Sequence, residues 1–197
     1  LAGSSAASDV YKRQSIFSNL PVTKLIAQRL EPTLMLSLTT LIFAVVVAVP
    51  MGVIAAWKAG TWVDRLIMIF AVFGFSVPVF VLGYMMIFSF SMELGILPVQ
   101  GYKSPFDDFW QFVRHITLPT ITLSVIYIAL IARITRASML EVLEEDYIRT
   151  ARAKGQTESR VLISHALKNA SIPIVTIIGI GIALLIGGVV VTESVYN

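Results

Sequence analysis

The stretch that decides the fold is Thr33–Trp57, which reads TLMLSLTTLIFAVVVAVPMGVIAAW and carries no charged side chain. At about 1.5 Å per residue, a helix of about 25 residues spans the hydrocarbon core of a bilayer. The whole chain shares this bias, because 56% of its 197 residues are apolar, only 14% are charged, and its mean hydropathy is +0.82. The sequence therefore predicts an all-α, polytopic helical membrane protein.

Three further apolar runs follow the first. Together they predict four spans, at residues 33–57, 66–92, 116–136 and 171–192. Gly74 and Pro78 interrupt the second run, but no polar turn reverses the chain there, so we expect one kinked span. Pro50, Gly74 and Pro78 free backbone carbonyls inside the spans, and kinks at such positions can open a cavity for a substrate. Proline and glycine are also common in membrane helices without that role, so a pathway role and an ordinary kink remain alternatives.

The segment between the third and fourth runs is strongly charged. Residues 133–168 hold seven Lys or Arg and five acidic side chains. Each charge costs about 2.5–3.5 kcal/mol at the bilayer centre, so the segment must lie outside the hydrocarbon. The positive-inside rule places it in the cytoplasm with the 58–65 turn, and it places residues 93–115 outside. In that outer connection, Ser104 and Pro105 predict the start of a short amphipathic helix on the membrane surface.

The cytoplasmic segment predicts two helices joined by a turn, over residues 137–170. Ser138 and Glu141 have capping-box spacing, and apolar residues then recur at helical spacing. Gly155 ends the first helix in a left-handed conformation, which costs other residues about 1–2 kcal/mol, and Thr157 can cap the second helix. A polar hairpin with two apolar stripes has no core of its own, so it must dock on the ends of the spans or on a partner.

The sequence contains no motif for catalysis or nucleotide binding. It has no phosphate-binding loop, no H-E-x-x-H zinc motif, no G-x-S-x-G elbow and no cysteine. His115 and His165 lie on opposite sides of the membrane in the predicted topology, so they cannot share a metal. The spans also lack the buried ionisable side chains of an ion-coupled carrier. We therefore expect that the chain is not an enzyme, binds no cofactor or metal, and is driven by something other than itself.

Two segments complete the predicted organisation of the chain. The last span carries a stripe of small residues, Gly179, Ala183 and Gly187, whose spacing lets a second helix approach closely, either within the subunit or from a second one. Residues 1–14 have no periodicity and no signal-peptide core, and we interpret them as an unrelated or artefactual remnant. Residues 15–197 then form an incomplete transmembrane domain.

Two stretches of the charged segment carry a family resemblance. Residues 146–155, DYIRTARAKG, and residues 165–173, HALKNASIP, resemble the conserved cytoplasmic loop of ABC importer permeases, specifically the dipeptide/oligopeptide/nickel branch of the binding-protein-dependent transport family. Residues 21–23, 29–30 and 74–78 resemble the same branch, so the similarity covers about residues 15–197. The Glu-Ala-Ala of the general importer motif would fall on Arg149, Thr150 and Ala151, where only the alanine matches.

The resemblance implies an importer with divided labour. Permeases of this family have six spans, so four of the six would be visible in this fragment. An external solute-binding protein delivers the substrate, two homologous permease subunits form the path, and ATPase subunits supply the energy in a prokaryotic inner membrane. The helix before Gly155 would insert into a groove on the ATPase, with the coupling residues Tyr147, Arg149, Thr150, Ala151, Lys154 and Gly155. The implied substrates are di- or oligopeptides, nickel or glutathione-like molecules.

Two other functions remain open from the residues alone. A secondary carrier or channel would need no ATPase, although the lack of buried ionisable groups argues against a carrier. A non-transporting membrane scaffold would use the hairpin to bind a signalling partner. Co-purification distinguishes these hypotheses, because a permease should bring down a protein that carries a phosphate-binding loop.

Overall fold

We describe the protein from a computed structural model, which covers residues 22–99 and 101–196. The chain divides into two units, residues 1–35 and 36–197, and residues 1–14 lie outside the described part. The described helices are α2 (Val22–Trp57), α3 (Trp62–Ser76), α4 (Val79–Met86), the π-helical η1 (Ile87–Glu93), α5 (Phe109–Leu143), α6 (Asp146–Ala153), α7 (Glu158–Arg160), the π-helical η2 (Val161–Leu167) and α8 (Lys168–Tyr196). These described residues contain no strand, as the predicted all-α fold requires.

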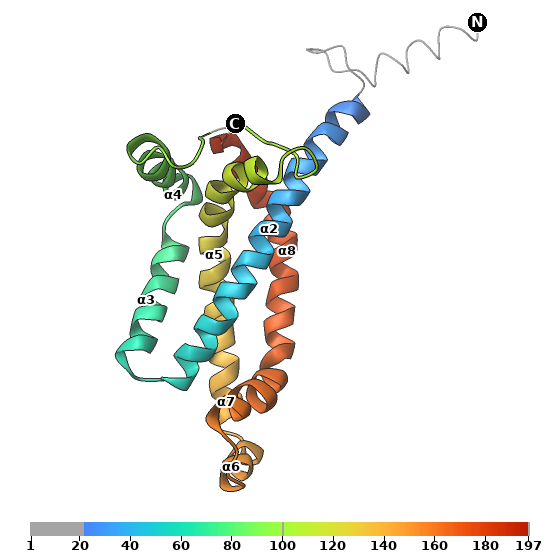
Figure 1. The fold of residues 1–197 in the computed structure, drawn as a ribbon. Helices are drawn as coiled ribbons and strands as arrows, with labels where there is room; N and C mark the ends of the chain where they lie inside the picture. Colours follow the sequence, from blue (N-terminus) through green and yellow to red (C-terminus); the bar gives the residue numbers. More distant parts are fainter. Residues whose placement is uncertain (1–21, 100, 197) are drawn as a thin grey trace, which may run out of the picture. The chain divides into compact units, whose positions relative to one another are not determined.

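Three of these helical segments are long and apolar enough to cross a membrane. They are Leu30–Trp57, Phe109–Leu143 and Glu158–Leu185. A fourth crossing is reached only if α3 and the α4–η1 segment are taken as one span, although they are bent by 102° at a short break. The kink predicted in the span at 66–92 is therefore a sharp break between two separate helices (Figure 1).

The break between α3 and α4 has a local cause at Pro78. The residue before a proline is pushed out of the helical region by a clash with the proline ring. Val77 accordingly adopts extended angles, φ −86° and ψ 125°, and Pro78 becomes the N-cap of α4. The sequence correctly marked this position, but a proline inside an apolar run does not reveal how sharply the chain will turn.

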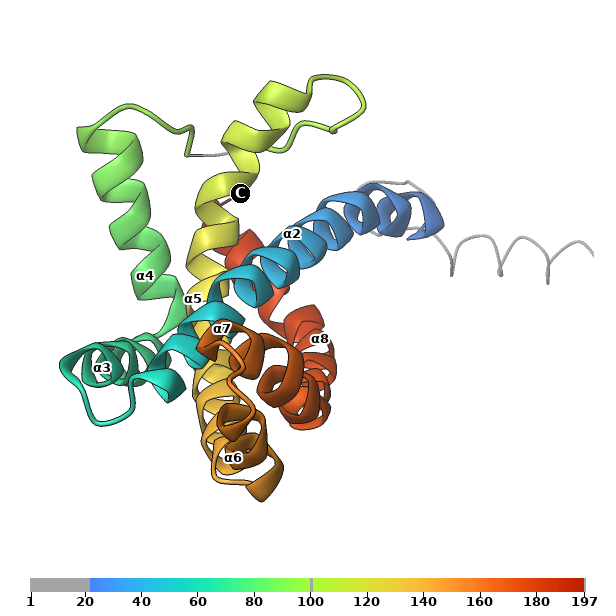
Figure 2. The ribbon, with the colours of Figure 1, turned by 60° about the horizontal axis from the view of Figure 1, so that its bottom comes forward.

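Helix α5 is the central element of the unit formed by residues 36–197. In its apolar window 56% of the residues are buried inside the structure, against 28% for the α2 span and 17% for the span that includes α8. Figures 1 and 2 both show α5 between α3 and α8. The other spans are therefore organised by their contacts with α5, and few residues in the apolar window of Glu158–Leu185 are buried by the described part of the chain.

The bounds of α5 correct two predictions about the loops. The helix begins at Phe109, where the Asp108 carboxylate accepts a hydrogen bond of 3.1 Å from the N–H of Gln111, so no separate surface helix starts at Ser104. At the other end α5 continues to Leu143, so that Ser138 is a buried residue within the helix rather than a cap. The charged residues at the ends of the predicted span at 116–136 therefore do not mark the ends of the helix, which continues past them on both sides.

Helix α2 packs on α5 through a face of small residues. At intervals of four, Thr40, Ala44, Ala48, Gly52 and Ala56 are all buried. A Cβ atom at Gly52 would lie 2.5 Å from Thr135 Cβ and 2.7 Å from the carbonyl oxygen of Ala132, so only glycine fits this contact. Farther along, the hydroxyls of Thr39 and Thr120 are 3.1 Å apart. Close approach of two backbones, rather than large side chains, holds this helix pair.

Candidate functional site

The charged segment forms a helical hairpin, residues 146–167, beyond the end of α5. Glu144 and Glu145 interrupt the helix that the sequence predicted from Ser138, and α6 starts at Asp146. Gly155 has φ 76°, which confirms the predicted left-handed turn. Thr157 is the N-cap residue of α7, but its side chain makes no capping hydrogen bond. The guanidinium of Arg152 and the carboxylate of Glu158 form an ion pair of 3.0 Å that joins α6 to α7.

One face of the hairpin docks on the ends of the spans. A buried apolar cluster joins Ala56 of α2 and Met139 of α5 to hairpin and α8 residues, namely Ile148, Ala151, Val161, Leu162, Ala166, Ala170 and Ile174. Of the two docking targets left open by the sequence, the ends of the spans therefore cover this face. Ala151 is only 7% exposed, so its small size is explained by packing inside the chain and not by contact with a partner.

The opposite face of α6 is open to solvent. Tyr147, Arg149, Thr150 and Lys154 are exposed, while Gly155 lies at the exposed turn. The amide of Asn169 donates a hydrogen bond of 2.9 Å to the Tyr147 hydroxyl, and Arg149 forms an ion pair of 3.2 Å with Asp146. Five of the six residues predicted for coupling are thus available to a partner on one accessible surface, and Ala151 is the exception.

The histidines take separate structural positions. His165 Nε2 lies 2.7 Å from Gln156 Oε1, so this side chain connects η2 to the turn after Gly155. His115 Nδ1 lies 2.7 Å from the carbonyl oxygen of Gln111, one helical turn earlier in α5. Within residues 22–99 and 101–196, no group of three or more His, Cys, Asp or Glu side chains could hold a metal ion.

The proposed pathway positions have different environments. Pro50 lies exposed in α2, which continues through it to Trp57. Gly74 is buried against α5, and a Cβ atom there would lie 3.0 Å from Val125 Cγ1. Pro78 lies at the break described above. Of the three, only Pro78 coincides with a break in the helix, and Gly74 is a packing residue between α3 and α5.

The stripe of small residues on α8 is open at Gly179 and Ala183, as far as the described residues show. A Cβ atom at Gly179 would meet nothing within 4 Å, and Ala183 is exposed. Gly187 belongs to α8, but its surroundings lie outside the described part. The contact with α5 is made instead near Gly181, where a Cβ atom would lie 3.5 Å from Tyr127 Cδ1. Packing of the predicted stripe inside the described chain is therefore not observed.

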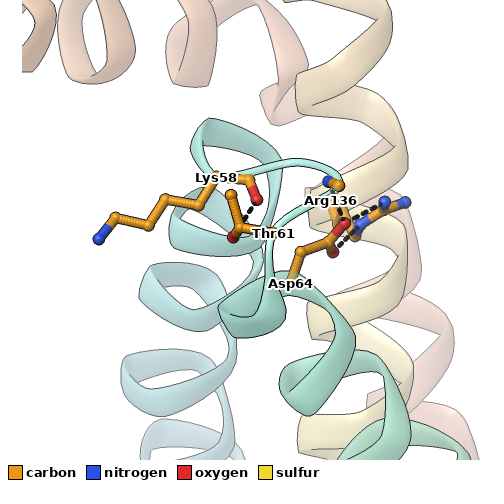
Figure 3. Close-up of polar contacts among 5 residues, drawn as sticks. Lys58, Thr61, Asp64 and Arg136 are labelled. Carbon is orange, nitrogen blue, oxygen red and sulfur yellow. Dashed lines mark hydrogen bonds and ion pairs between the residues drawn. The ribbon is translucent and has the colours of Figure 1, made fainter.

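Sequence reasoning missed an ion pair between α3 and α5. Arg136 Nε and Nη2 donate to Asp64 Oδ1 and Oδ2 at 2.5 and 2.7 Å, and Asp64 is only 4% exposed (Figure 3). Both residues lie on the predicted cytoplasmic side, so their opposite charges were a usable signal. The pair was missed because the span ends were treated as boundaries rather than as parts of continuing helices.

Comparison with known proteins identifies the family. A family model described as "Binding-protein-dependent transport system inner membrane component" matches residues 48–197. The chain belongs to this family. It is 54% identical over 194 residues to the "Probable peptide ABC transporter permease protein y4tP" of Sinorhizobium fredii, a match that covers 97% of this chain and 62% of that protein.

A second relative is the "Glutathione transport system permease protein GsiC" of Escherichia coli (strain K12). It is 46% identical over 183 residues, which are 93% of this chain and 57% of that protein. The chain thus spans about three fifths of the length of these curated relatives. As a member of the binding-protein-dependent permease family with long apolar helices, it is an all-α, multi-pass membrane protein, which confirms the predicted fold class and family.

Proposed function

We propose that the chain is part of a permease subunit of an ATP-driven importer, and that the hairpin couples it to a separate ATPase. The observation that carries the proposal is the two-sided hairpin. Its inner face is fixed to α2, α5 and α8 by the buried cluster, and its outer face presents Tyr147, Arg149, Thr150 and Lys154. A partner that moved this surface would act directly on the ends of three helices.

The buried cluster supports transmission of movement from the hairpin to the spans. Met139 of α5 is fully buried in the apolar cluster that contains the hairpin residues. Ala56, near the end of α2, belongs to the same cluster. Packed interiors have low compressibility and transmit strain. The hairpin lies at the opposite end of α5 from α4 in Figure 1, so a movement of α5 would reach the far side of the unit.

We assign the substrate class as di- or oligopeptides, with nickel as the alternative. The names of the two relatives refer to a peptide and to glutathione, which is itself a tripeptide. The remaining partners of the proposal are a second permease subunit, an external solute-binding protein and the lipids of a prokaryotic inner membrane. The 17% buried share of the α8 span and its open stripe at Gly179 support a second permease subunit as a packing partner.

The test uses charge reversal on the exposed face of the hairpin. Lys154→Glu should weaken association with the ATPase encoded by a neighbouring reading frame, because the side chain is exposed and has no structural role in the buried cluster. Lys103→Glu is the matched control, since it is also an exposed lysine but lies in the connection predicted to be outside. Association is measured by pull-down, together with substrate-stimulated ATP hydrolysis in nanodiscs.

The outcomes separate the three hypotheses. Loss of ATPase association in Lys154→Glu, with Lys103→Glu unchanged, supports the importer. Uptake into vesicles without any ATPase would favour a carrier or channel. The scaffold would be favoured if the hairpin captured no protein with a phosphate-binding loop and the membranes showed no uptake.

A further inference from the structure

Both oxygens of the buried Asp64 carboxylate, which links α3 to α5, accept hydrogen bonds. Asp64 Oδ1 accepts from Arg136 Nε, and Asp64 Oδ2 accepts both from Arg136 Nη2 and from the backbone N–H of Gly60 at 3.0 Å. The Asp64 side chain is 6% exposed and the Arg136 side chain 27%. A two-point arginine–carboxylate contact of this kind fixes orientation as well as distance.

The turn between α2 and α3 is shaped to complete this contact. Gly60 has φ 78°, and the Thr61 hydroxyl donates to the carbonyl oxygen of Lys58 at 2.6 Å (Figure 3). The left-handed conformation at Gly60 directs its N–H to the carboxylate four residues ahead. The end of α2, the start of α3 and the α5 side chain therefore meet at one carboxylate.

The rest of α3 is attached to the protein by few side chains. Its buried residues are Asp64, Ala71 and Gly74, and its large apolar side chains, including Leu66, Ile69, Phe70 and Phe73, are exposed. Ala71 and Gly74 are small, and they add little side-chain surface to the contact with α5. The ion pair is the charged contact between α3 and α5, and it adds to the packing of Gly74 on Val125 and to the approach of Arg133 to the ring of Phe75.

The same part of α5 also contacts the hairpin. Met139 lies three residues after Arg136, is fully buried, and belongs to the same apolar cluster as Ile148 and Val161 of the hairpin. We propose that Asp64 and Arg136 form a latch that makes α3 move together with α5 when the hairpin is displaced. The two side chains are positioning residues, and the inference rests on the coupling role proposed above.

The latch gives the broken span a mechanical connection to the hairpin. Helix α3 leads directly into the break at Val77 and Pro78, beyond which α4 packs on α5 and α8. Without the ion pair, α5 could move relative to α3, and its displacement would not reach the break at Val77 and Pro78. With it, a displacement at the hairpin end is carried along α3 to the joint before α4.

The first experiment measures whether α3 and the hairpin behave as one body. Because the chain has no cysteine, spin labels can be attached to cysteines replacing Ile69 and Ser159, both exposed, and the distance between them measured by pulsed electron paramagnetic resonance. The permease is reconstituted in nanodiscs without and with its ATPase. We expect one narrow distance distribution in the otherwise unmodified protein, and a broad or displaced one in Asp64→Asn and Arg136→Ala.

The control variant is Arg133→Ala. It removes the same charge from the same helix, and the contact with α3 that it loses is the weaker one, because Arg133 is exposed and its guanidinium carbon lies 5.8 Å from the centroid of the Phe75 ring. Its distance distribution should stay narrow. Asp64→Asn keeps the shape of the side chain and an acceptor for the Gly60 N–H, so it tests the latch even if Arg136→Ala fails to fold.

The second experiment measures coupling. In both latch variants, substrate-stimulated ATP hydrolysis should fall about tenfold, while ATPase association and unstimulated hydrolysis stay unchanged. Cysteines at positions 64 and 136, joined by a short bis-maleimide, should restore stimulation that the unlinked pair lacks. Because a covalent link also stabilises the folded chain, the unlinked pair is first shown to be folded and to associate with the ATPase, so that recovery on linking reports the connection between the helices.

The failures of the two proposals are distinguishable. If the unmodified protein does not associate with the ATPase, the proposed function is overturned. If it does associate, but the spin-label distances in Asp64→Asn and Arg136→Ala match those of the unmodified protein, the latch is overturned and the coupling proposal stands. Full stimulated hydrolysis in Asp64→Asn would overturn the latch in the same way.

Discussion

Helices α2 and α8 both carry small residues at intervals of four, but among the described residues only the face on α2 is packed against another helix. On α2, Gly52 is pressed so closely against α5 that a Cβ atom would meet Ala132 and Thr135. On α8, Gly179 faces open space and Ala183 is exposed. Spacing alone therefore predicts that a helix can be approached closely, and it does not predict which helix will approach.

The largest effect should come from filling the closed face. Gly52→Leu places a side chain where even a Cβ atom would be 2.7 Å from a backbone oxygen, so α2 and α5 must separate. We expect a destabilisation of about 4 kcal/mol or more, and little folded protein, measured by the yield of monodisperse protein and its unfolding in mixed micelles. Recovery of a normally folded Gly52→Leu protein would contradict the α2–α5 contact.

The ion pair tests a polar contact beside this small-residue contact. Arg136→Ala leaves the 6% exposed Asp64 carboxylate without its guanidinium, which should cost about 3–5 kcal/mol. Asp64→Ala should cost less, about 1–3 kcal/mol, because the 27% exposed Arg136 side chain can reach water. The free energies of unfolding in mixed micelles compare the two, and the opposite order would show that the burial of Asp64 is not the dominant factor.

Some features of the fold could be predicted from local sequence, and others could not. The apolar runs and the left-handed turn at Gly155 follow from local chemistry, and the structure has helices along the runs and a positive φ at the glycine. The length of α5 and the direction of Ala151 do not, because both depend on which surfaces the folded chain brings together. Likewise, Asp64 and Arg136 are 72 residues apart, so no local pattern relates one to the other.

A smaller effect is expected at the turn of the hairpin. Gly155 has φ 76° and nothing within 4 Å of a Cβ position, so a substitution there is opposed by backbone strain and not by space. Gly155→Val should cost about 1–2 kcal/mol and weaken association with the ATPase in pull-down. Gly155→Asn is the control, since asparagine tolerates the left-handed region better, and it should retain most of the association. Equal loss in both variants would point to a contact of the glycine itself.

The smallest effect on the chain itself should come from filling the open face. Gly179→Leu meets nothing within 4 Å, so the free energy of unfolding of the isolated chain should change by no more than about 0.5 kcal/mol. If a second permease packs on this stripe, the same substitution should nevertheless reduce pairing of the two permeases, because small residues at such an interface let backbones approach closely. Pairing is measured by co-purification of differently tagged permeases.

Ile182→Leu is the matched control, since it alters an exposed side chain on α8 without adding bulk. Unchanged pairing in Gly179→Leu would show that the open stripe faces lipid, and α2 and α8 would then differ in whether their small residues serve a protein contact at all.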